Sequence, residues 1–111
     1  MKKITFRYAD ALLMKAEAKV RNGEEAAFEL NQIRSRVGMP NRAATLENIL
    51  EERLLELVWE GWRRQDMIRF GKYQSTWWAK KKATADNKVL LPIPLEIINA
   101  NPNLVQNEGY K

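Results

Sequence analysis

Three glutamates recur four residues apart in the middle of the chain, at Glu52, Glu56 and Glu60. On a helix this spacing places carboxylates along one face, where they can ligate two metal ions or perform acid–base chemistry on a glycoside. Helical di-metal sites usually add a Glu-x-x-His pair, and the chain has no histidine. No nucleophile or cleft marks a hydrolytic site, and neighbouring arginines would neutralise the carboxylates. We therefore predict no enzyme activity, no catalytic residue, no metal site and no cofactor.

The same glutamates are better explained as part of a structural ion-pair network that joins Arg53, Glu56, Glu60 and Arg64. Arg53 lies three residues before Glu56 and Glu60 lies four before Arg64, and both spacings bring helical side chains into contact. In a helical projection these charges fall inside or at the edge of an apolar arc. Either this face meets a polar partner, or the charges are buried and paired. A buried pair predicts a loss of roughly 3–5 kcal/mol for Glu60→Ala.

An aromatic group beside lysines supplies the candidate ligand-binding residues, Tyr73, Trp77 and Trp78. Such side chains can stack on sugars or on the bases of single-stranded nucleic acid. Large aromatics mostly bury themselves, so we expect at least one of the two tryptophans in the core. No helix-turn-helix spacing, zinc signature or RNP-like motif supports nucleic acid as a partner.

Composition indicates one folded domain over residues 1–111, with 45% hydrophobic and 30% charged residues. The absence of cysteine excludes disulfides, thiolate metal sites and thiol catalysis. The net charge of +5 is concentrated between Trp62 and Lys88 and could attract an acidic partner, nucleic acid or anionic lipid. No apolar run approaches the length of a membrane span. The basic start of the chain has no apolar segment after it, so we expect no signal peptide.

Apolar periodicity predicts a helix over residues 6–22 and a second over residues 24–37. Gly23 and Gly38 can end these helices, and Pro40 prevents the second from resuming. So short a turn makes the two helices antiparallel. The pair resembles a tetratricopeptide-type hairpin.

A third, long helix is predicted over residues 46–70, with the Thr45 hydroxyl capping its first turn. Gly61 lies inside this pattern and could bend the helix, because glycine is a poor helix former. Residues 89–111 are predicted to be mostly extended or turn, with one short helix at Leu95–Asn99. The predicted fold class is therefore all-α: a tetratricopeptide-like αα-hairpin, a long third helix and an extended C-terminal segment.

Four sequence motifs, in order, resemble the C-terminal portion of the SusD/RagB family. They are RYADALLMKAEA (7–18), LNQIRSRVGMP (30–40), ERLLELVWEGWRRQDMIRFG (52–71) and LLPIPLEIINANPNLVQNEGY (90–110). The resemblance covers nearly the whole chain, and four ordered motifs make it far more specific than any one of them.

This resemblance implies an outer-membrane lipoprotein of Bacteroidetes that captures glycans or other nutrients above a TonB-dependent transporter. Members of the family are built around four tetratricopeptide-like helix pairs, and they bind ligands rather than catalyse reactions. Two features differ from the family pattern: this chain is several times shorter, and it has no signal peptide or lipidated cysteine. We therefore expect a fragment that is mainly helical scaffold, belongs to a protein of the cell outer membrane, and carries over no binding residue.

A fragment of a helical repeat leaves an apolar face uncovered, and such faces promote association, so self-association is expected. The competing hypothesis is a free-standing helical interaction module whose basic patch binds an acidic protein or nucleic acid. The two hypotheses differ in salt dependence, because binding to nucleic acid weakens steeply as salt rises.

Overall fold

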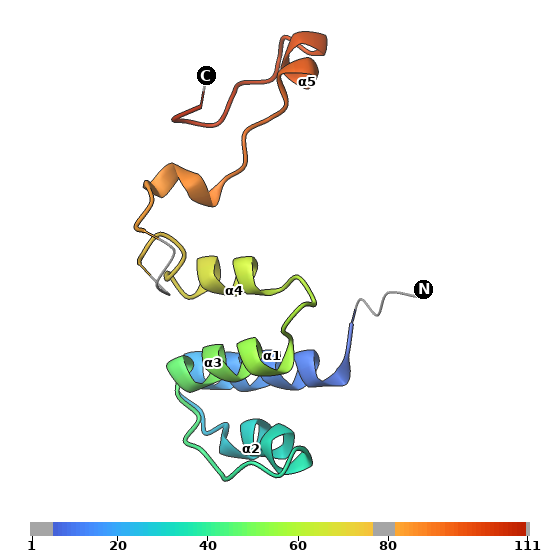
Figure 1. Cartoon of the computed structure of the whole chain (residues 1–111), viewed down its shortest axis with the longest axis vertical. Coiled ribbons are helices and arrows are strands. Elements are labelled where there is room, and N and C mark those ends of the chain that lie inside the picture. The colour runs from blue at the N-terminus through green and yellow to red at the C-terminus, as the bar shows by residue number, and fades with distance from the viewer. Residues whose placement is uncertain (1–5, 77–81, 111) are drawn as a thin grey trace. The chain divides into compact units, whose positions relative to one another are not determined.

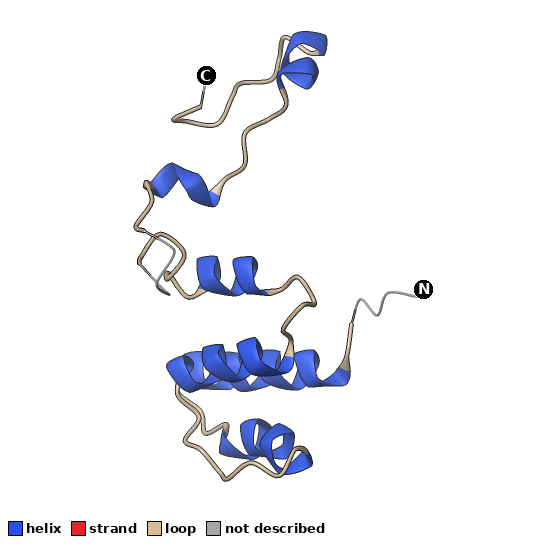
Figure 2. Cartoon of the chain, viewed as in Figure 1, coloured by secondary structure: helices blue, strands red, loops and turns tan. Residues whose placement is uncertain are grey.

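The computed structural model describes residues 6–76 and 82–110 (Figure 1). Among these residues every regular element is a helix (Figure 2), which confirms the predicted all-α class. No helix in these ranges is long and apolar enough to cross a membrane.

The sequence predicted one domain, and the chain divides into two compact units, Met1–Asp66 (unit 1) and Met67–Lys111 (unit 2). In chain order the helices are α1 (Tyr8–Arg21), α2 (Ala27–Arg36), α3 (Leu46–Glu56), α4 (Arg63–Arg69), η1 (Asp86–Val89, a 3-10 helix) and α5 (Leu95–Ala100).

Helices α1 and α2 form the predicted hairpin, and each ends at the predicted glycine. Gly23 has φ of 77° and Gly38 has φ of 73°, a left-handed conformation that glycine adopts without steric cost. After α1 the N–H of Glu24 donates to the carbonyl of Lys19 at 2.8 Å, and after α2 the N–H of Met39 donates to that of Arg34 at 2.9 Å. This pairing satisfies carbonyls that the helix end leaves open.

Helix α2 begins at Ala27, three residues later than predicted. One carboxylate oxygen of Glu25 accepts hydrogen bonds from the N–H groups of Ala26 (2.9 Å) and Ala27 (2.7 Å). Glu25 therefore acts as a cap outside the helix rather than as part of its first turn, and its negative charge suits a helix start.

The core of unit 1 forms where α1 packs against both α2 and α3, and α1 and α3 run side by side in Figure 1. Leu13, Leu30 and Ile49, one from each helix, are fully buried. Ala16 is buried as well, and its small side chain allows the neighbouring helices to approach closely. Thr45 caps α3 as predicted, because its hydroxyl oxygen accepts from the N–H of Asn48 at 3.1 Å.

The single long helix predicted over 46–70 is wrong: α3 ends at Glu56 and α4 starts at Arg63. Another α-helical turn would need the N–H of Glu60 to donate to the carbonyl of Glu56. The Arg7 guanidinium already donates to that carbonyl at 2.7 Å, and the N–H of Glu60 turns to Leu57 at 3.1 Å. Trp59 (φ 67°) and Gly61 (φ 86°) then reverse the backbone. We infer that Arg7, which lies 49 residues before Glu56 in the chain, ends α3 by donating to this carbonyl.

In unit 2 the C-terminal tail is held against the extended segment before α5. The side-chain amide of Gln106 bonds both the N–H (2.8 Å) and the carbonyl (2.9 Å) of Ile93. The Tyr110 hydroxyl donates to the carbonyl of Leu90 at 2.8 Å, and the ammonium of Lys88 lies 4.5 Å from the centre of the Tyr110 ring. Helix α5, Leu95–Ala100, matches the short helix predicted after Pro94 to within one residue.

Candidate functional site

The most unusual feature of unit 1 is a fully buried arginine between two carboxylates. Arg53 of α3 is 2% exposed, and its Nε donates to Asp66 Oδ2 of α4 at 2.8 Å. Its Nη1 lies 2.8 Å from Asp10 Oδ1 of α1, an ion pair rather than an aligned hydrogen bond. Asp10 and Asp66 are themselves buried. Arg53 therefore connects three helices, and removing it would leave two carboxylates away from water.

A second buried pair joins α2 to α3. Nη1 of Arg34 lies 2.5 Å from Oε2 of Glu52, and Nε of Arg34 donates to the carbonyl of Pro40 at 2.8 Å. Both side chains are buried. The guanidinium therefore also fixes the chain that leaves α2.

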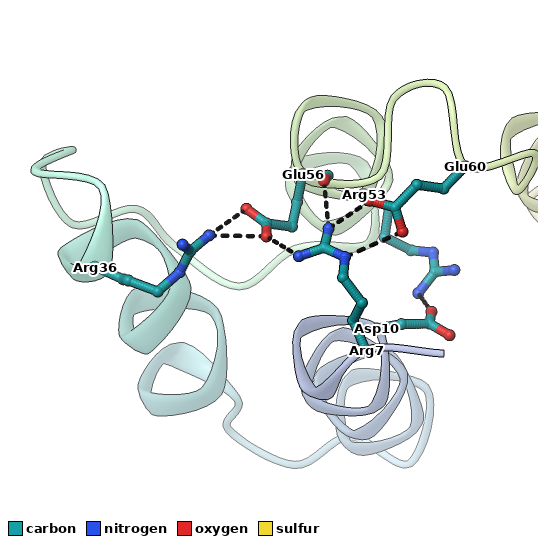
Figure 3. Close-up of polar contacts among 6 residues, drawn as sticks. All are labelled: Arg7, Asp10, Arg36, Arg53, Glu56 and Glu60. Atoms are coloured by element: carbon teal, nitrogen blue, oxygen red, sulfur yellow. Dashed lines mark hydrogen bonds and ion pairs between the residues drawn. The ribbon is translucent and has the colours of Figure 1, made fainter. Parts of the chain in front are cut away.

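A third, partly exposed cluster surrounds the end of α3 (Figure 3). Arg7 lies between Glu56 and Glu60, with Nη1 donating to Glu56 Oε1 at 2.9 Å and Nε donating to Glu60 Oε2 at 3.1 Å. Nη2 of Arg36 reaches the other side of Glu56, at 2.8 and 2.9 Å from its two oxygens. Hydrogen bonds to Glu60 and then to Glu56 raise the pKa of Arg7 above its ordinary value. This cluster joins the start of α1 to the ends of α2 and α3.

The structure gives Arg53, Glu56 and Glu60 ion-pair partners, but not those predicted from sequence spacing. Arg53 binds Asp10 and Asp66 rather than its neighbour Glu56. Glu56 and Glu60 are held by Arg7, which lies about fifty positions earlier in the chain. Every partner comes from a different element, so the contacts fasten helices to one another instead of bracing one helix.

These contacts change the expected cost of Glu60→Ala. The side chains of Arg7 and Glu60 are 28% and 27% exposed, and Arg7 keeps both Glu56 acceptors when Glu60 is removed. A partly exposed pair contributes little, so we expect a loss of about 1 kcal/mol in the free energy of unfolding, measured by urea denaturation. A loss of about 3 kcal/mol or more would show that Glu60 is essential to the cluster.

Glu29 on α2 is a buried carboxylate held by two lysines of α1. Its Oε1 lies 3.0 Å from Nζ of Lys15 and 3.1 Å from Nζ of Lys19. Hydrogen bonds from Lys15 and then Lys19 lower the pKa of Glu29 from 4.5 to about 2, against the opposing effect of burial. Because the folded-state pKa is lowered, Glu29 stabilises the fold fully above pH 4.5, and this contribution is lost as pH falls toward 2.

The pH dependence of Glu29→Gln tests this pair. The variant should melt at a lower temperature than the parent at pH 7, and the difference should shrink as pH falls from 4.5 toward 2. Thermal unfolding followed by circular dichroism across this range measures the difference. Glu24→Gln, at an exposed position beside the same turn, is the control and should show no such trend. A difference that stays constant down to pH 2 would mean that the charge of Glu29 adds nothing.

The chemistry of these clusters is structural. Within residues 6–76 and 82–110 no group of three or more acidic side chains is gathered so that it could hold a metal ion. All three regularly spaced glutamates form ion pairs with arginines: Glu52 with Arg34, and Glu56 and Glu60 with Arg7. Glu60 is the one of the three that stays partly exposed to solvent. Carboxylates fixed in this way are poor general acids or bases, because proton transfer needs a free, suitably tuned group.

An open groove of about 460 Å³ lies between α1 and α2. Its walls include Tyr8, Leu12 and Ile33, together with Arg7 and Arg36. The volume falls within the range of small-ligand sites. Both arginines already form ion pairs with Glu56. Neither guanidinium is therefore available to recognise a charged ligand in the groove.

The aromatic ligand-binding prediction remains largely untested. Tyr73 is half-buried in unit 2 and already has a partner. Trp77 and Trp78 lie outside the described residues. Arg64, the fourth member of the predicted network, belongs to unit 1 and has an interaction of its own.

Sequence reasoning missed three arginines and two aspartates of the clusters, and four of these five residues lie outside the third motif. One signal could have identified Asp10: it lies three residues before Leu13, so it shares the helix face of that fully buried side chain. The missed residues are Arg7, Asp10, Arg34, Arg36 and Asp66.

The sequence of this chain is similar to those of a known protein family. A sequence model of the SusD family matches residues 2–110. The starch-binding protein SusD of Bacteroides thetaiotaomicron is 36% identical over 116 residues, which cover 96% of this chain and 21% of the relative. SusD-like protein P38 of Formosa agariphila is 37% identical, with 96% and 24% covered. The chain therefore spans about a fifth to a quarter of the length of the curated relatives it matches.

The structure of this chain is also similar to solved structures of a glycan-binding protein. Surface glycan-binding protein A from Bacteroides thetaiotaomicron matches with a TM-score of 0.85 and 37% identity, covering 96% of this chain and 24% of that one. A structure of that protein in complex with laminarihexaose matches with a TM-score of 0.84 and 38% identity, covering 95% and 24%. The fold of this chain thus occurs within a protein about four times as long.

Proposed function

The chain belongs to the SusD family, and from that membership we propose that it is the helical scaffold of a SusD-like, glycan-binding protein. The observation that carries the proposal is its similarity, across 95% of its length, to a protein whose structure was solved with laminarihexaose. The proposed ligand class is therefore an oligosaccharide. The proposed location is the cell outer membrane, with a TonB-dependent transporter as partner.

The internal chemistry of unit 1 supports a scaffold rather than a ligand site. Its buried charges are committed to one another across α1, α2, α3 and α4. Rigid, paired charges fix the relative positions of helices, which a repeat-based scaffold requires. We propose that most ligand contacts of such a protein lie outside the matched quarter, the part of the longer protein that corresponds to this chain. The relatives are named as binding proteins, which supports a non-catalytic role.

A chimera tests the scaffold role. The matched quarter of surface glycan-binding protein A would be replaced by this chain, which is 37% identical to it. The chimera should fold and bind laminarihexaose, as measured by isothermal titration calorimetry. A second chimera that carries Arg53→Ala is the matched control and should lose folding, because it disrupts the buried cluster. A folded chimera without affinity for laminarihexaose would contradict the proposed function.

The alternative, an interaction module for an acidic protein or nucleic acid, rests on the net charge of +5 and the pI of about 9.6. It predicts binding to labelled DNA or RNA whose affinity falls steeply between 50 and 200 mM salt, roughly as counterion release requires. The scaffold proposal predicts no such binding. Fluorescence anisotropy at several salt concentrations separates the two.

The isolated chain is expected to self-associate. Unit 1 exposes large apolar side chains to solvent, and contiguous apolar surface promotes association. Light scattering at high micromolar concentration should give the mass of a dimer or a larger species, and a monomer would contradict this prediction. The exposed apolar residues of unit 1 include Phe6, Tyr8, Leu55, Val58 and Trp59.

A further inference from the structure

The turn between α1 and α2 contains a pair of residues that can react with each other. Asn22 and Gly23 follow α1 directly, and Asn22 is the only asparagine of the chain that precedes a glycine. Both residues are exposed. A β-carbon added to Gly23 would meet nothing within 4 Å, so this side of the turn is open to solvent. Water therefore reaches both the carboxamide of Asn22 and the backbone beside it.

The reaction of this pair is deamidation. The nitrogen of Gly23 attacks Cγ of Asn22, the bond between Cγ and Nδ2 breaks, and ammonia leaves with the proton that Gly23 loses. The product is a cyclic succinimide. Water then opens the ring at either carbonyl, which gives aspartate or isoaspartate at this position. Glycine favours the attack, because it has no Cβ to hinder its nitrogen and its backbone rotates freely.

The folded turn opposes this attack. Asn22 has ψ of 2°, so the nitrogen of Gly23 lies beside the nitrogen of Asn22 rather than beside its Cβ. Ring closure therefore needs rotation about the Cα–C bond of Asn22. In the fold the N–H of Gly23 donates to the carbonyl of Val20 at 3.1 Å, and the N–H of Glu24 donates to that of Lys19 at 2.8 Å. Rotation would break both bonds, and the first of them also holds the proton that the reaction must remove.

We propose that Asn22 is a site of spontaneous deamidation and that opening of the turn at the end of α1 sets its rate. Helix ends open more readily than the packed core, because opening them exposes little buried surface. Here the opening frees the nitrogen of Gly23, while Leu13 and Leu30 stay packed in the core. Water is the co-reactant, and no enzyme or cofactor is needed. The reaction also involves no ligand, so it goes beyond the proposed function and does not depend on it.

Both products carry a negative charge that Asn22 lacks. The charge lies at the C-terminal end of α1, where the helix dipole disfavours an anion, and it is close in sequence to Glu24. Isoaspartate also adds a carbon to the main chain before Gly23. The N–H groups of Gly23 and Glu24 then no longer align with the carbonyls of Val20 and Lys19, and the bonds that close the helix end are lost. Deamidation should therefore loosen the turn that joins α1 to α2.

Incubation of the full chain in mildly alkaline buffer tests the proposal, because hydroxide removes the proton of the Gly23 nitrogen. Peptide mapping by mass spectrometry should show aspartate and isoaspartate at Asn22 before any other asparagine has reacted. In denaturing guanidinium chloride the reaction should be about five- to thirtyfold faster, the protection expected from two backbone hydrogen bonds. No product at Asn22, or equal rates in the folded and denatured chains, would overturn the proposal.

The end of α2 offers a matched turn in the same chain. Gly38 has φ of 73°, and the N–H groups of Gly38 and Met39 donate to carbonyls of α2 at 3.1 and 2.9 Å, as in the first turn. Val37 precedes Gly38 and is half exposed, but it has no carboxamide. Val37→Asn should create a second site that reacts within about fivefold of the rate at Asn22. A folded Val37→Asn variant with no product at this turn would show that the turn geometry does not permit the reaction, and the proposal fails.

Two substitutions at Asn22 separate the reaction from its effect on stability. Asn22→Gln keeps the amide but lengthens the side chain, so the succinimide cannot form and the product should disappear. Asn22→Asp has the charge without the longer main chain, and it should melt a few degrees below the parent. Chains converted to isoaspartate should melt lower still, because they also lose the helix-closing bonds. Converted chains that melt at the temperature of the parent would contradict the loosening of the turn.

Discussion

Replacing Arg53 by alanine is expected to lower the free energy of unfolding by about 3–5 kcal/mol. The substitution leaves the buried Asp10 carboxylate without the counter-charge that Arg53 provides, and it removes the Arg53 ion pair of the buried Asp66. It also removes the ion pairs that join α3 to α1 and to α4. A loss of this size is a large part of the total stability of a small domain, so much of the variant should be unfolded at 37 °C. Urea denaturation followed by circular dichroism measures it.

Two further variants separate the charge from the packing. Arg42→Ala removes a guanidinium that pairs with the exposed Glu51, and it should cost less than about 1 kcal/mol. The triple variant Asp10→Leu, Arg53→Met, Asp66→Leu removes all three charges together and should recover much of the loss, because an apolar triad leaves no charge stranded. A loss for Arg53→Ala similar to that for Arg42→Ala would show that the cluster does not stabilise the fold.

Glu52→Ala is expected to have the next largest effect, again about 3–5 kcal/mol. Arg34 is buried, and Glu52 is its carboxylate partner, at 2.5 Å. Without Glu52 the guanidinium keeps the Pro40 carbonyl but no negative charge. The contact between α2 and α3 should weaken, and with it the packing of the hairpin on α3. Thermal and urea unfolding of the variant give the size of the effect.

Glu51→Ala is the matched control for Glu52→Ala. It changes the adjacent residue of the same helix, but that glutamate is about half exposed and pairs with Arg42 at the surface. Its expected cost is below about 1 kcal/mol. Equal losses for the two variants would mean that burial does not distinguish the two ion pairs.

Local rules were sufficient to predict the fold class and most helix ends. The Thr45 cap and the glycine stops at Gly23 and Gly38 depend only on neighbouring residues, and the structure has all three. The hairpin follows from two periodic segments joined by a short turn. These features are encoded within a few positions of the residues concerned, which is why the sequence alone predicts them.

The partners of the buried charges could not be predicted in the same way. Spacing along one helix pointed to Arg53–Glu56 and Glu60–Arg64, but the observed partners of Arg53, Glu56 and Glu60 lie on other elements. Which side chains meet across helices depends on tertiary packing, which no local spacing specifies. The break in the predicted long helix has the same origin, because it depends on Arg7 donating to the carbonyl of Glu56.

The clusters have a consequence for function. Every helix of unit 1 contributes at least one charge to them, so the arrangement of the helices is fixed by directional contacts as well as by apolar packing. Such contacts specify one arrangement of helices more narrowly than apolar packing does. A scaffold that must present a binding surface built elsewhere in the protein gains from this rigidity.

The most direct test of the scaffold role is the affinity of the chimera for laminarihexaose, measured by calorimetry beside surface glycan-binding protein A itself. If this chain supplies an equivalent scaffold, the two dissociation constants should agree to within about tenfold, a difference of about 1.4 kcal/mol. A chimera that melts cooperatively but binds laminarihexaose more than about a hundredfold more weakly would contradict the proposal that this chain is the scaffold of a glycan-binding protein.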